Sequence, residues 1–316
     1  MMKERTLRVL EFTKIRDRLA SKAMTDMGRE RCEALVPSSN MTEIQRMQAE
    51  TEEATVILQY VGASPLVPFS DVRASLTLAE KGATLSPKAL LEVAALMQSA
   101  RAARKALDTE RDNTPILKEL AQRLSTLHNV EQDITNAIIS EDEIADRASN
   151  ELMDIRRHLR GANERIKEKL NQMIRSSAFQ KYLQDPIVTM RNDRYCLPVK
   201  AEYRGSVPGL VHDQSSTGAT LFIEPMAAVE MGNELKTWAA KEKQEIERIL
   251  AALSAEIAPY ADQLRETVET LAELDYIFAK GMLSREMNAV SPKLNRNGYI
   301  NTVSYTHLTL PTKLEV

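Results

Sequence analysis

One stretch of the sequence repeats apolar side chains with a helical period over a length that no small domain can enclose. Nine apolar residues follow one another at intervals of three or four positions: Ile144, Ala148, Leu152, Ile155, Leu159, Ala162, Ile166, Leu170 and Met173. No proline interrupts them, and the pattern is that of an amphipathic helix. A helix over 141–183 would span roughly 60 Å at 1.5 Å per residue. The chain is therefore predicted to contain a rod that projects from, or bridges, its other parts.

A second apolar stripe runs through the carboxy-terminal third of the chain. It comprises Leu235, Trp238, Ile246, Ile249, Leu253, Ile257, Leu264, Val268, Leu271, Leu274 and Phe278. Pro259 is predicted to kink or interrupt this helix, because proline lacks the helical donor and clashes with the preceding turn. The two stripes are predicted to face each other as an antiparallel pair. Trp238 falls on the stripe, so its indole is predicted to pack in a core rather than to stack on a nucleobase.

The segment between the stripes loses the helical period. Residues 195–225 alternate short β-branched or aromatic runs with glycine and proline, which is typical of strands and turns. Strands are predicted at 185–190, 195–199, 209–212 and 219–223, with turns at Gly205, Pro208 and Gly218. The segment is therefore predicted to form a small antiparallel β tip carried on a two-helix stalk.

The amino-terminal part is predicted to be a body of shorter helices. They are placed at 6–23, 25–37, 41–61, 72–107 and 116–127, with a break at Lys81-Gly82. Asn40 and Ser86 are predicted to cap two of them, and Pro87 suits the first helical position.

The predicted fold is mainly α, a helical core whose long antiparallel helices carry a small antiparallel β tip. The expected parts are a helical core over 1–140, a first stalk helix over 141–183, a β-rich tip over 184–226, returning helices over 227–300 and an atypical tail over 301–316. The tail has no helical period and is expected to be non-native sequence.

Basic residues are concentrated in one segment although the whole chain is slightly acidic. Thirteen Lys or Arg and seven Asp or Glu lie between Arg147 and Arg204, a local charge of +6 in a chain of net charge −3. A basic rod and tip on an acidic body is the pattern of a surface that meets phosphate. Long exposed helices are also often rich in Arg and Lys because these side chains keep them solvated.

Seven side chains are candidate phosphate contacts: Arg156, Arg157, Arg160, Arg191, Arg194, Lys200 and Arg204. Such contacts position a protein on nucleic acid without reading its sequence. The segment has no base-reading helix signature, and Tyr195 and Tyr203 are too few for a platform that stacks single-stranded bases. The alternative is that the tip is a dimer contact or a rigid end-piece whose charges only solvate it.

One loop contains the groups of a Ser-His-acid site: His212, Asp213, Ser215 and Ser216. Adjacent residues of one loop cannot supply the ordered base and orienter of such a site, so a hairpin loop is predicted there.

Three other candidates also have simple structural explanations. Glu224 precedes Pro225 and is predicted to cap the start of a helix. The acidic run 141–143 is predicted to compensate a helix dipole rather than to hold a metal ion. His158, on the helical rod, is predicted to face solvent or a phosphate.

The remaining composition indicates a cytoplasmic protein. Cys32 and Cys196 lie far apart, have no Cys or His at metal-ligand spacing, and are expected to be reduced thiols. No run of about 18 apolar residues exists, and the first residues lack the apolar segment of a signal peptide. No membrane partner, metal or cofactor is expected for this chain.

Several motifs together resemble one family. They are the entry motif Thr25-Asp26-Met27-Gly28-Arg29-Glu30, the triplet Asp71-Val72-Arg73, and the run Gly218-Ala219-Thr220-Leu221-Phe222-Ile223-Glu224-Pro225. Over about residues 5 to 300 the chain is similar to the second bacterial branch of the MutS family. No single motif carries the resemblance, which rests on their number and order.

The resemblance implies an amino-terminal fragment of a longer protein, with a helical core, lever helices and a clamp at the far end of the levers. It further implies an ATPase domain and a nuclease module elsewhere. ATP and Mg²⁺ are expected only there, because this sequence has no Gly-x-x-x-x-Gly-Lys-Ser/Thr. This chain alone is not expected to be an enzyme.

Members of this branch are homodimers that bind branched DNA and suppress recombination, and ATP-driven factors that split collided ribosomes. The resemblance therefore implies branched DNA, or a ribosome and its RNA, as the partner. Two other interpretations stay open: a helical scaffold whose stalk binds another protein, and a hydrolase that uses the His212 loop.

Overall fold

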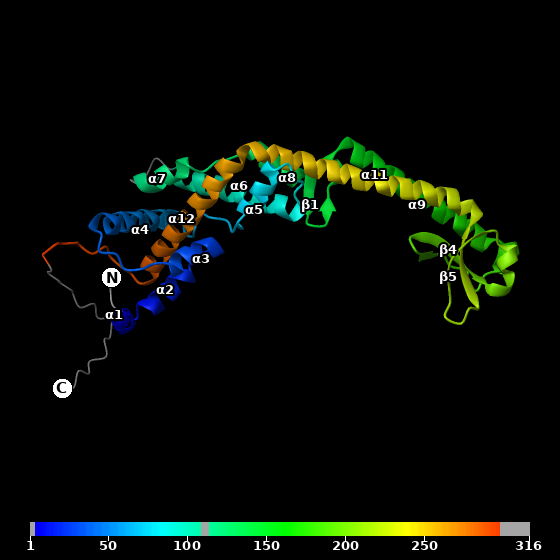
Figure 1. The fold of residues 1–316 in the computed structure, drawn as a ribbon, viewed down its shortest axis with the longest axis horizontal. Coiled ribbons are helices and arrows are strands. Elements are labelled where there is room, and N and C mark those ends of the chain that lie inside the picture. The colour runs from blue at the N-terminus through cyan, green and yellow to red at the C-terminus, as the bar shows by residue number, and fades with distance from the viewer. Residues whose placement is uncertain (1–3, 109–113, 298–316) are drawn as a thin grey trace, which may run out of the picture.

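The protein is elongated. A computed structural model describes residues 4–108 and 114–297. Figure 1 shows a helical body at one end, two long helices that run away from it, and a small sheet at the far end. The long helices are α9 (Asn150–Arg175) and α11 (Met226–Ile257), which we call the stalk. Residues 177–225, which lie between these helices in the sequence, form the tip.

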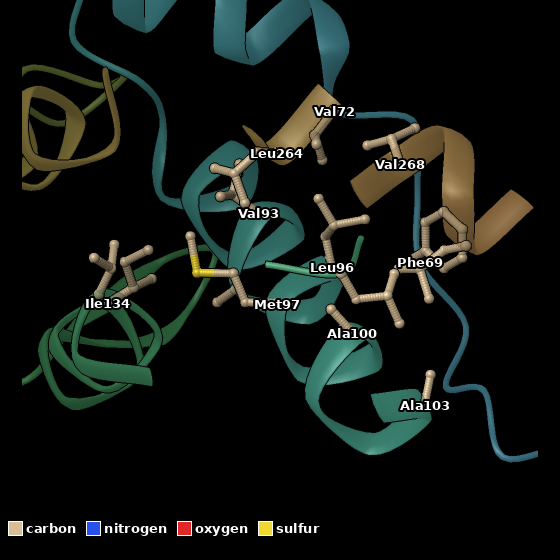
Figure 2. Packing of buried hydrophobic residues seen from close by; sticks show 14 of the residues in the cluster. Phe69, Val72, Val93, Leu96, Met97, Ala100, Ala103, Ile134, Leu264 and Val268 are labelled. Carbon is tan, nitrogen blue, oxygen red and sulfur yellow. The ribbon is translucent and has the colours of Figure 1, made fainter. Parts of the chain in front are cut away.

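The body consists of shorter helices packed around α12 (Ala261–Glu286). They are α1 (Glu4–Val9), α2 (Phe12–Ala20), α3 (Asp26–Glu33), α4 (Met41–Val61), α5 (Arg73–Glu80), α6 (Pro87–Leu107), α7 (Pro115–Gln122) and α8 (His128–Ala137). Figure 2 shows their shared core, in which side chains of α6 lie between those of α8 and α12. Its fully buried members include Val93, Leu96, Met97, Ile134 and Leu264. The prediction of a mainly helical protein is confirmed.

Helix caps set several of the predicted boundaries. The Asn40 Oδ1 atom accepts a hydrogen bond from the Thr42 amide at 3.1 Å, and α4 spans the predicted 41–61. Ser86 accepts from the Ala89 amide at 3.2 Å, and Pro87 is the first residue of α6. Both capping predictions are confirmed. The predicted helix over 6–23 is divided instead, because Glu11 adopts a left-handed conformation with φ +52° between α1 and α2.

The first stalk helix starts later than predicted. Residues 138–148 form a hairpin of β1 (Ile138–Ser140) and β2 (Glu143–Ile144), followed by a 3₁₀ turn, η1 (Asp146–Ala148). Ile144 is buried in the body core from this hairpin, so its helical spacing from the later apolar residues is coincidental. α9 begins at Asn150, after Ser149 accepts a hydrogen bond from the Leu152 amide at 2.9 Å. Its 26 residues correspond to about 39 Å.

The two stalk helices bury their apolar stripes against each other. The buried residues of α9 are Leu152, Ile155, Ala162, Ile166 and Leu170. Ser149 also donates to Glu245 Oε1 of α11 at 2.6 Å, which ties the start of α9 to its partner. α11 ends at Ile257, and η3 (Ala258–Tyr260) separates it from α12. The predicted interruption at Pro259 is confirmed.

The tip is an antiparallel sheet of order β3-β4-β6-β5. The strands are β3 (Thr189–Arg191), β4 (Arg194–Lys200), β5 (Gly209–Gln214) and β6 (Thr220–Pro225), with η2 (Ala201–Ser206) between β4 and β5. Leu197, Val199 and Ile223 form a second core with Ile166 and Leu170 of the stalk. The last three strand predictions are confirmed, whereas the strand predicted at 185–190 is confined to Thr189–Arg191.

We expect the carboxyl pair of Glu256 in α11 and Asp133 in α8 to make stability depend on pH. Burial, and then the neighbouring carboxyl of Asp133, raise the pKa of Glu256. A raised folded-state pKa gives a stability contribution that is present at low pH and lost as pH rises through that pKa. We expect Glu256→Gln to raise the melting temperature at pH 7 by roughly 1–2 °C, and to change it little at pH 4. A thermal scan at both pH values checks this; equal gains at both would contradict it.

The predicted tail over 301–316 lies outside the described residues. Within the ranges that the structure covers, no helix combines the length and apolar character needed to cross a bilayer.

Candidate nucleic-acid interface

One face of α9 is turned toward the side from which the tip projects. Arg156, Arg160, Asn163 and Lys167 follow one another at intervals of four, three and four, and so share a helix face. At the body end, Arg160 donates to Asp146 Oδ2 at 3.2 Å, and at the tip end the Tyr195 hydroxyl donates to Asn163 Oδ1 at 3.0 Å. Figure 1 shows the β1–β2 hairpin and the tip sheet on the same side of the stalk. We call this side the underside.

Arg156 fixes the base of the stalk. Its Nε donates to Glu242 Oε1 of α11 at 2.7 Å, and its Nη1 donates to the Ile144 carbonyl and to Asp146 Oδ1 at 2.7 and 2.6 Å. Hydrogen bonds from Arg156 and Arg160 hold the pKa of Asp146 below its usual range. With its side chain 19% exposed, Arg156 joins the hairpin to both stalk helices and has few donors left for a phosphate.

Arg194 is engaged in the same way inside the tip. Glu224 is only 1% exposed; its Oε1 accepts from Arg194 Nη1 at 3.2 Å, and its Oε2 lies 2.8 Å from His212 Nε2. Arg194, 14% exposed, also donates to Asn233 Oδ1 at 2.8 Å. A Cβ at Gly232 would lie 2.6 Å from Glu224 Oε1, so glycine lets α11 approach this cluster. We call Glu224, Arg194 and His212 the buried triad.

The predicted helix cap at Glu224 is wrong. β6 continues to Pro225, and α11 begins at Met226 without a side-chain cap. The strand therefore places the Glu224 carboxylate in the buried triad rather than at the free amides of the helix. Two long-range partners on β4 and β5 determine its position.

The His212 loop has the geometry of a hairpin. The His212 ring points to Glu224, whereas Ser215 Oγ accepts a hydrogen bond from the Thr220 amide at 3.1 Å. Gly218 supplies the turn with φ +73°. Asp213 pairs with Arg191 at 3.2 Å. In this loop no hydroxyl is bonded to the His212 imidazole, so the contact that activates a serine nucleophile is missing.

The other predicted phosphate contacts differ in their exposure and in whether they already pair with a carboxylate. Arg157 and Arg160 form surface ion pairs with Asp154 and Asp146 and remain 68% and 62% exposed. Such pairs are worth little and exchange readily for other anions. Arg191 is half-buried, with its guanidinium 4.1 Å above the Phe222 ring. Lys200 and Arg204 have no carboxylate partner among the described residues.

Four further cations of this region were not predicted as phosphate contacts from the sequence: Lys167, Lys169, Arg175 and Lys181. Among the eight Lys and Arg of 167–204, only Arg191 and Arg194 pair with a carboxylate of the described chain. Many body arginines are paired, namely Arg18, Arg31, Arg46, Arg73, Arg101, Arg123 and Arg265. The signal was present in the sequence, because only Asp185 and Asp193 are acidic between Lys169 and Lys200.

Trp238 lies on the surface of the stalk, and the prediction that it packs in a core is wrong. Its half-buried indole stacks on His158 with ring centroids 4.4 Å apart and an interplanar angle of 13°. Lys241 Nζ lies 4.3 Å from the indole centroid, and the indole N–H donates to Glu234 at 3.3 Å. His158 is exposed, as predicted.

The acidic run and the thiols complete the candidates. Glu141 and Asp142 occupy the turn of the β1–β2 hairpin, so the predicted role at a helix start is wrong. Within 4–108 and 114–297, no three His, Cys, Asp or Glu side chains are grouped to hold a metal ion. Cys32 and Cys196 are buried free thiols; burial raises the pKa of Cys32 to about 12 and that of Cys196 to about 11.

The relatives found by comparison with known proteins share one name. No protein-family model matches the chain. The Endonuclease MutS2 of Alkaliphilus oremlandii is 47% identical over 313 residues, which cover 98% of this chain and 40% of the relative. The Endonuclease MutS2 of Acetivibrio thermocellus is 46% identical over 299 residues, 93% of this chain and 38% of the relative. The Endonuclease MutS2 of Clostridioides difficile is 44% identical over 315 residues, which cover 99% of this chain and 40% of the relative. The chain thus spans about 40% of the length of these curated relatives.

Proposed function

The chain belongs to the MutS2 family in the part of those proteins that it spans, and on this premise we propose that its tip and the adjoining end of the stalk bind nucleic acid through the phosphate backbone. The observation that carries the proposal is the set of cations without carboxylate partners in 167–204. A cation that already has an intramolecular partner gains less from a phosphate than one that is only hydrated. The free cations of 167–204 also follow one another with few acidic residues between them, so we expect phosphate binding to be most favourable there.

The buried side chains of the same region support a positioning role. Arg156 and the buried triad fix the stalk base and the tip, so the free cations of the tip are presented on a rigid frame. Phosphate contacts made from such a frame recognise the shape of a backbone rather than a base sequence. This supports branched DNA or the folded RNA of stalled, collided ribosomes as the ligand.

The activity of a whole relative extends this proposal. We place ATP and Mg²⁺ binding, the nuclease module and homodimer formation in the part of the relatives that this chain does not span. In that arrangement ATP would open and close the stalk and tip around the nucleic acid. The competing function is a helical scaffold whose stalk binds another protein, and the feature that favours it is the half-buried Trp238 stacked on the exposed His158.

A binding series separates these functions. The chain is titrated with a four-way DNA junction, a plain duplex of the same length and purified ribosomes, from about 50 to 200 mM salt. We expect a plot of the logarithm of the binding constant against the logarithm of the salt concentration to be linear, with a slope of about −0.9 for each phosphate neutralised. Tighter binding to the junction or to ribosomes than to the duplex identifies the ligand. No binding at low salt by the folded chain would favour the scaffold.

A further inference from the structure

One part of the tip combines aromatic rings with free cations. Phe179, Tyr182 and Tyr203 are half-buried there, and Lys181 and Arg204 are exposed beside them. We call these five residues the apex. We propose that the apex stacks one unpaired base on Tyr203 and holds the neighbouring phosphate with Lys181 and Arg204, so that the chain favours nucleic acid with unpaired nucleotides. This inference rests on the proposed function and names the class of its ligand.

Two segments that are distant in the sequence bring the rings together. Phe179 lies in α10 (Ser177–Gln180), and Tyr182 follows in the next turn. The Lys200 amide donates to the Tyr182 carbonyl at 3.0 Å, which holds this turn against the end of β4. η2 then places the Tyr203 ring 5.3 Å from that of Tyr182.

The arrangement leaves Tyr203 as the available stacking surface. The Phe179 ring meets the Tyr182 ring edge-on, with 5.9 Å between the ring centroids. Lys181 Nζ lies 4.8 Å from the centroid of the Tyr182 ring. Among the described residues, Tyr182 is the only aromatic ring in contact with the Tyr203 ring, and it is tilted. It packs on the tip core and is otherwise half-exposed. A base stacked on Tyr203 would therefore have Tyr182 as a side wall.

The hydroxyl groups distinguish these tyrosines from a purely structural one. Tyr195, also in the tip, donates its hydroxyl to Asn163 at 3.0 Å and fixes the sheet to the stalk. The Tyr182 and Tyr203 hydroxyls have no protein partner among the residues that the structure covers. The sequence-based prediction found too few aromatic residues for a stacking surface because it considered only Tyr195 and Tyr203. In the fold, the Tyr203 ring lies beside that of Tyr182, which in turn contacts Phe179.

The cations of the apex suit a phosphate next to a stacked base. Among the described residues, the one hydrogen bond of the Arg204 side chain is a long one, 3.5 Å to the Gly209 carbonyl. Lys181 contacts a ring and no carboxylate of the described chain. Aromatic side chains that stack bases, combined with cations that track the backbone, are the general means of binding single strands. A continuous duplex keeps its bases stacked and could use only the cations.

The test compares a single-stranded oligonucleotide with an abasic strand of the same length, which keeps the phosphates and lacks the bases. DNA and RNA versions of the single strand distinguish the two natural sources of this ligand. Binding of the 316-residue chain is measured by fluorescence anisotropy for the wild type and for Tyr203→Leu. Tyr60→Leu, which changes an exposed tyrosine of the body, is the matched control.

We expect the wild type to bind the normal strand about five- to tenfold more tightly than the abasic strand, which is the lower part of the range for stacking one base. Tyr203→Leu should abolish that ratio, and Tyr60→Leu should retain it. Circular dichroism verifies that both variants are folded. Equal binding of normal and abasic strands by the wild type would overturn the stacking site. If both strands bind equally and affinity still falls with salt, the phosphate proposal stands without the apex.

Discussion

Replacing Glu224 with alanine is expected to destabilise the tip by about 3 kcal/mol or more, because removing one partner of a buried ion pair leaves an uncompensated charge. Glu224 is 1% exposed and holds both Arg194 and His212. Among the described residues, alanine would leave the Arg194 guanidinium with only the Asn233 amide oxygen as a partner. The body core is formed by other residues, so the body is expected to stay folded.

Cys196 gives a local measurement of this effect. The thiol lies in β4, fully buried in the tip, and reacts only when the sheet opens. In a Cys32→Ala background, labelling of Cys196 should be about a hundredfold faster in Glu224→Ala, the equivalent of about 3 kcal/mol. Glu202→Ala, which removes an exposed carboxylate of the same tip, is the control. Unchanged labelling in Glu224→Ala would show that the buried triad does not stabilise the tip.

Neutralising three free cations of the tip and one at the adjoining end of α9 is expected to cause the largest loss of nucleic-acid affinity. The variant is Arg175/Lys181/Lys200/Arg204→Gln, which keeps long polar side chains and removes four charges. If each contacts one phosphate, the log–log salt slope should become shallower by about 3.6, since each contact contributes about 0.9. None of the four has a carboxylate partner within the described chain, so their loss should leave the fold intact.

A variant of equal charge change makes this result specific. Lys81, Lys105, Lys118 and Lys293 lie in the body or beyond α12, and also lack carboxylate partners among the described residues. Their replacement by glutamine should change the slope by less than about 1, the value for one phosphate. Equal losses in both variants would mean that only net charge matters, and would remove the reason to assign binding to the tip.

Local signals were sufficient to predict much of the fold from the sequence. Asn40 and Ser86 satisfy amides two or three residues away, and Pro259 acts on its own turn. The failures involve competing local structure or distant partners. α8 was not predicted, because Leu127, at its cap position, has no capping side chain. The hairpin at 138–144 mimicked a helical stripe, since Ile144 is buried with the spacing of a helix but from a strand.

The candidate site was less predictable, because charge alone does not reveal ion pairs. Arg194 and Arg204 read alike in the sequence, yet one is bound to Glu224 and the other is exposed. The partner of Arg194 lies 30 residues away on another strand, and only the register of the sheet brings them together. Trp238 shows the same limit, since it falls at the edge of the apolar stripe and so lies beside His158 rather than in the core.

The most direct test of nucleic-acid binding by the tip is a lysine footprint. The chain is acetylated briefly, with and without the tightest ligand of the binding series, and modification is quantified by mass spectrometry. If the tip binds nucleic acid, we expect protection of Lys181 and Lys200 in the tip, and unchanged modification of Lys81 and Lys105 in the body. Protection of the body lysines with no change at Lys181 and Lys200 would contradict it.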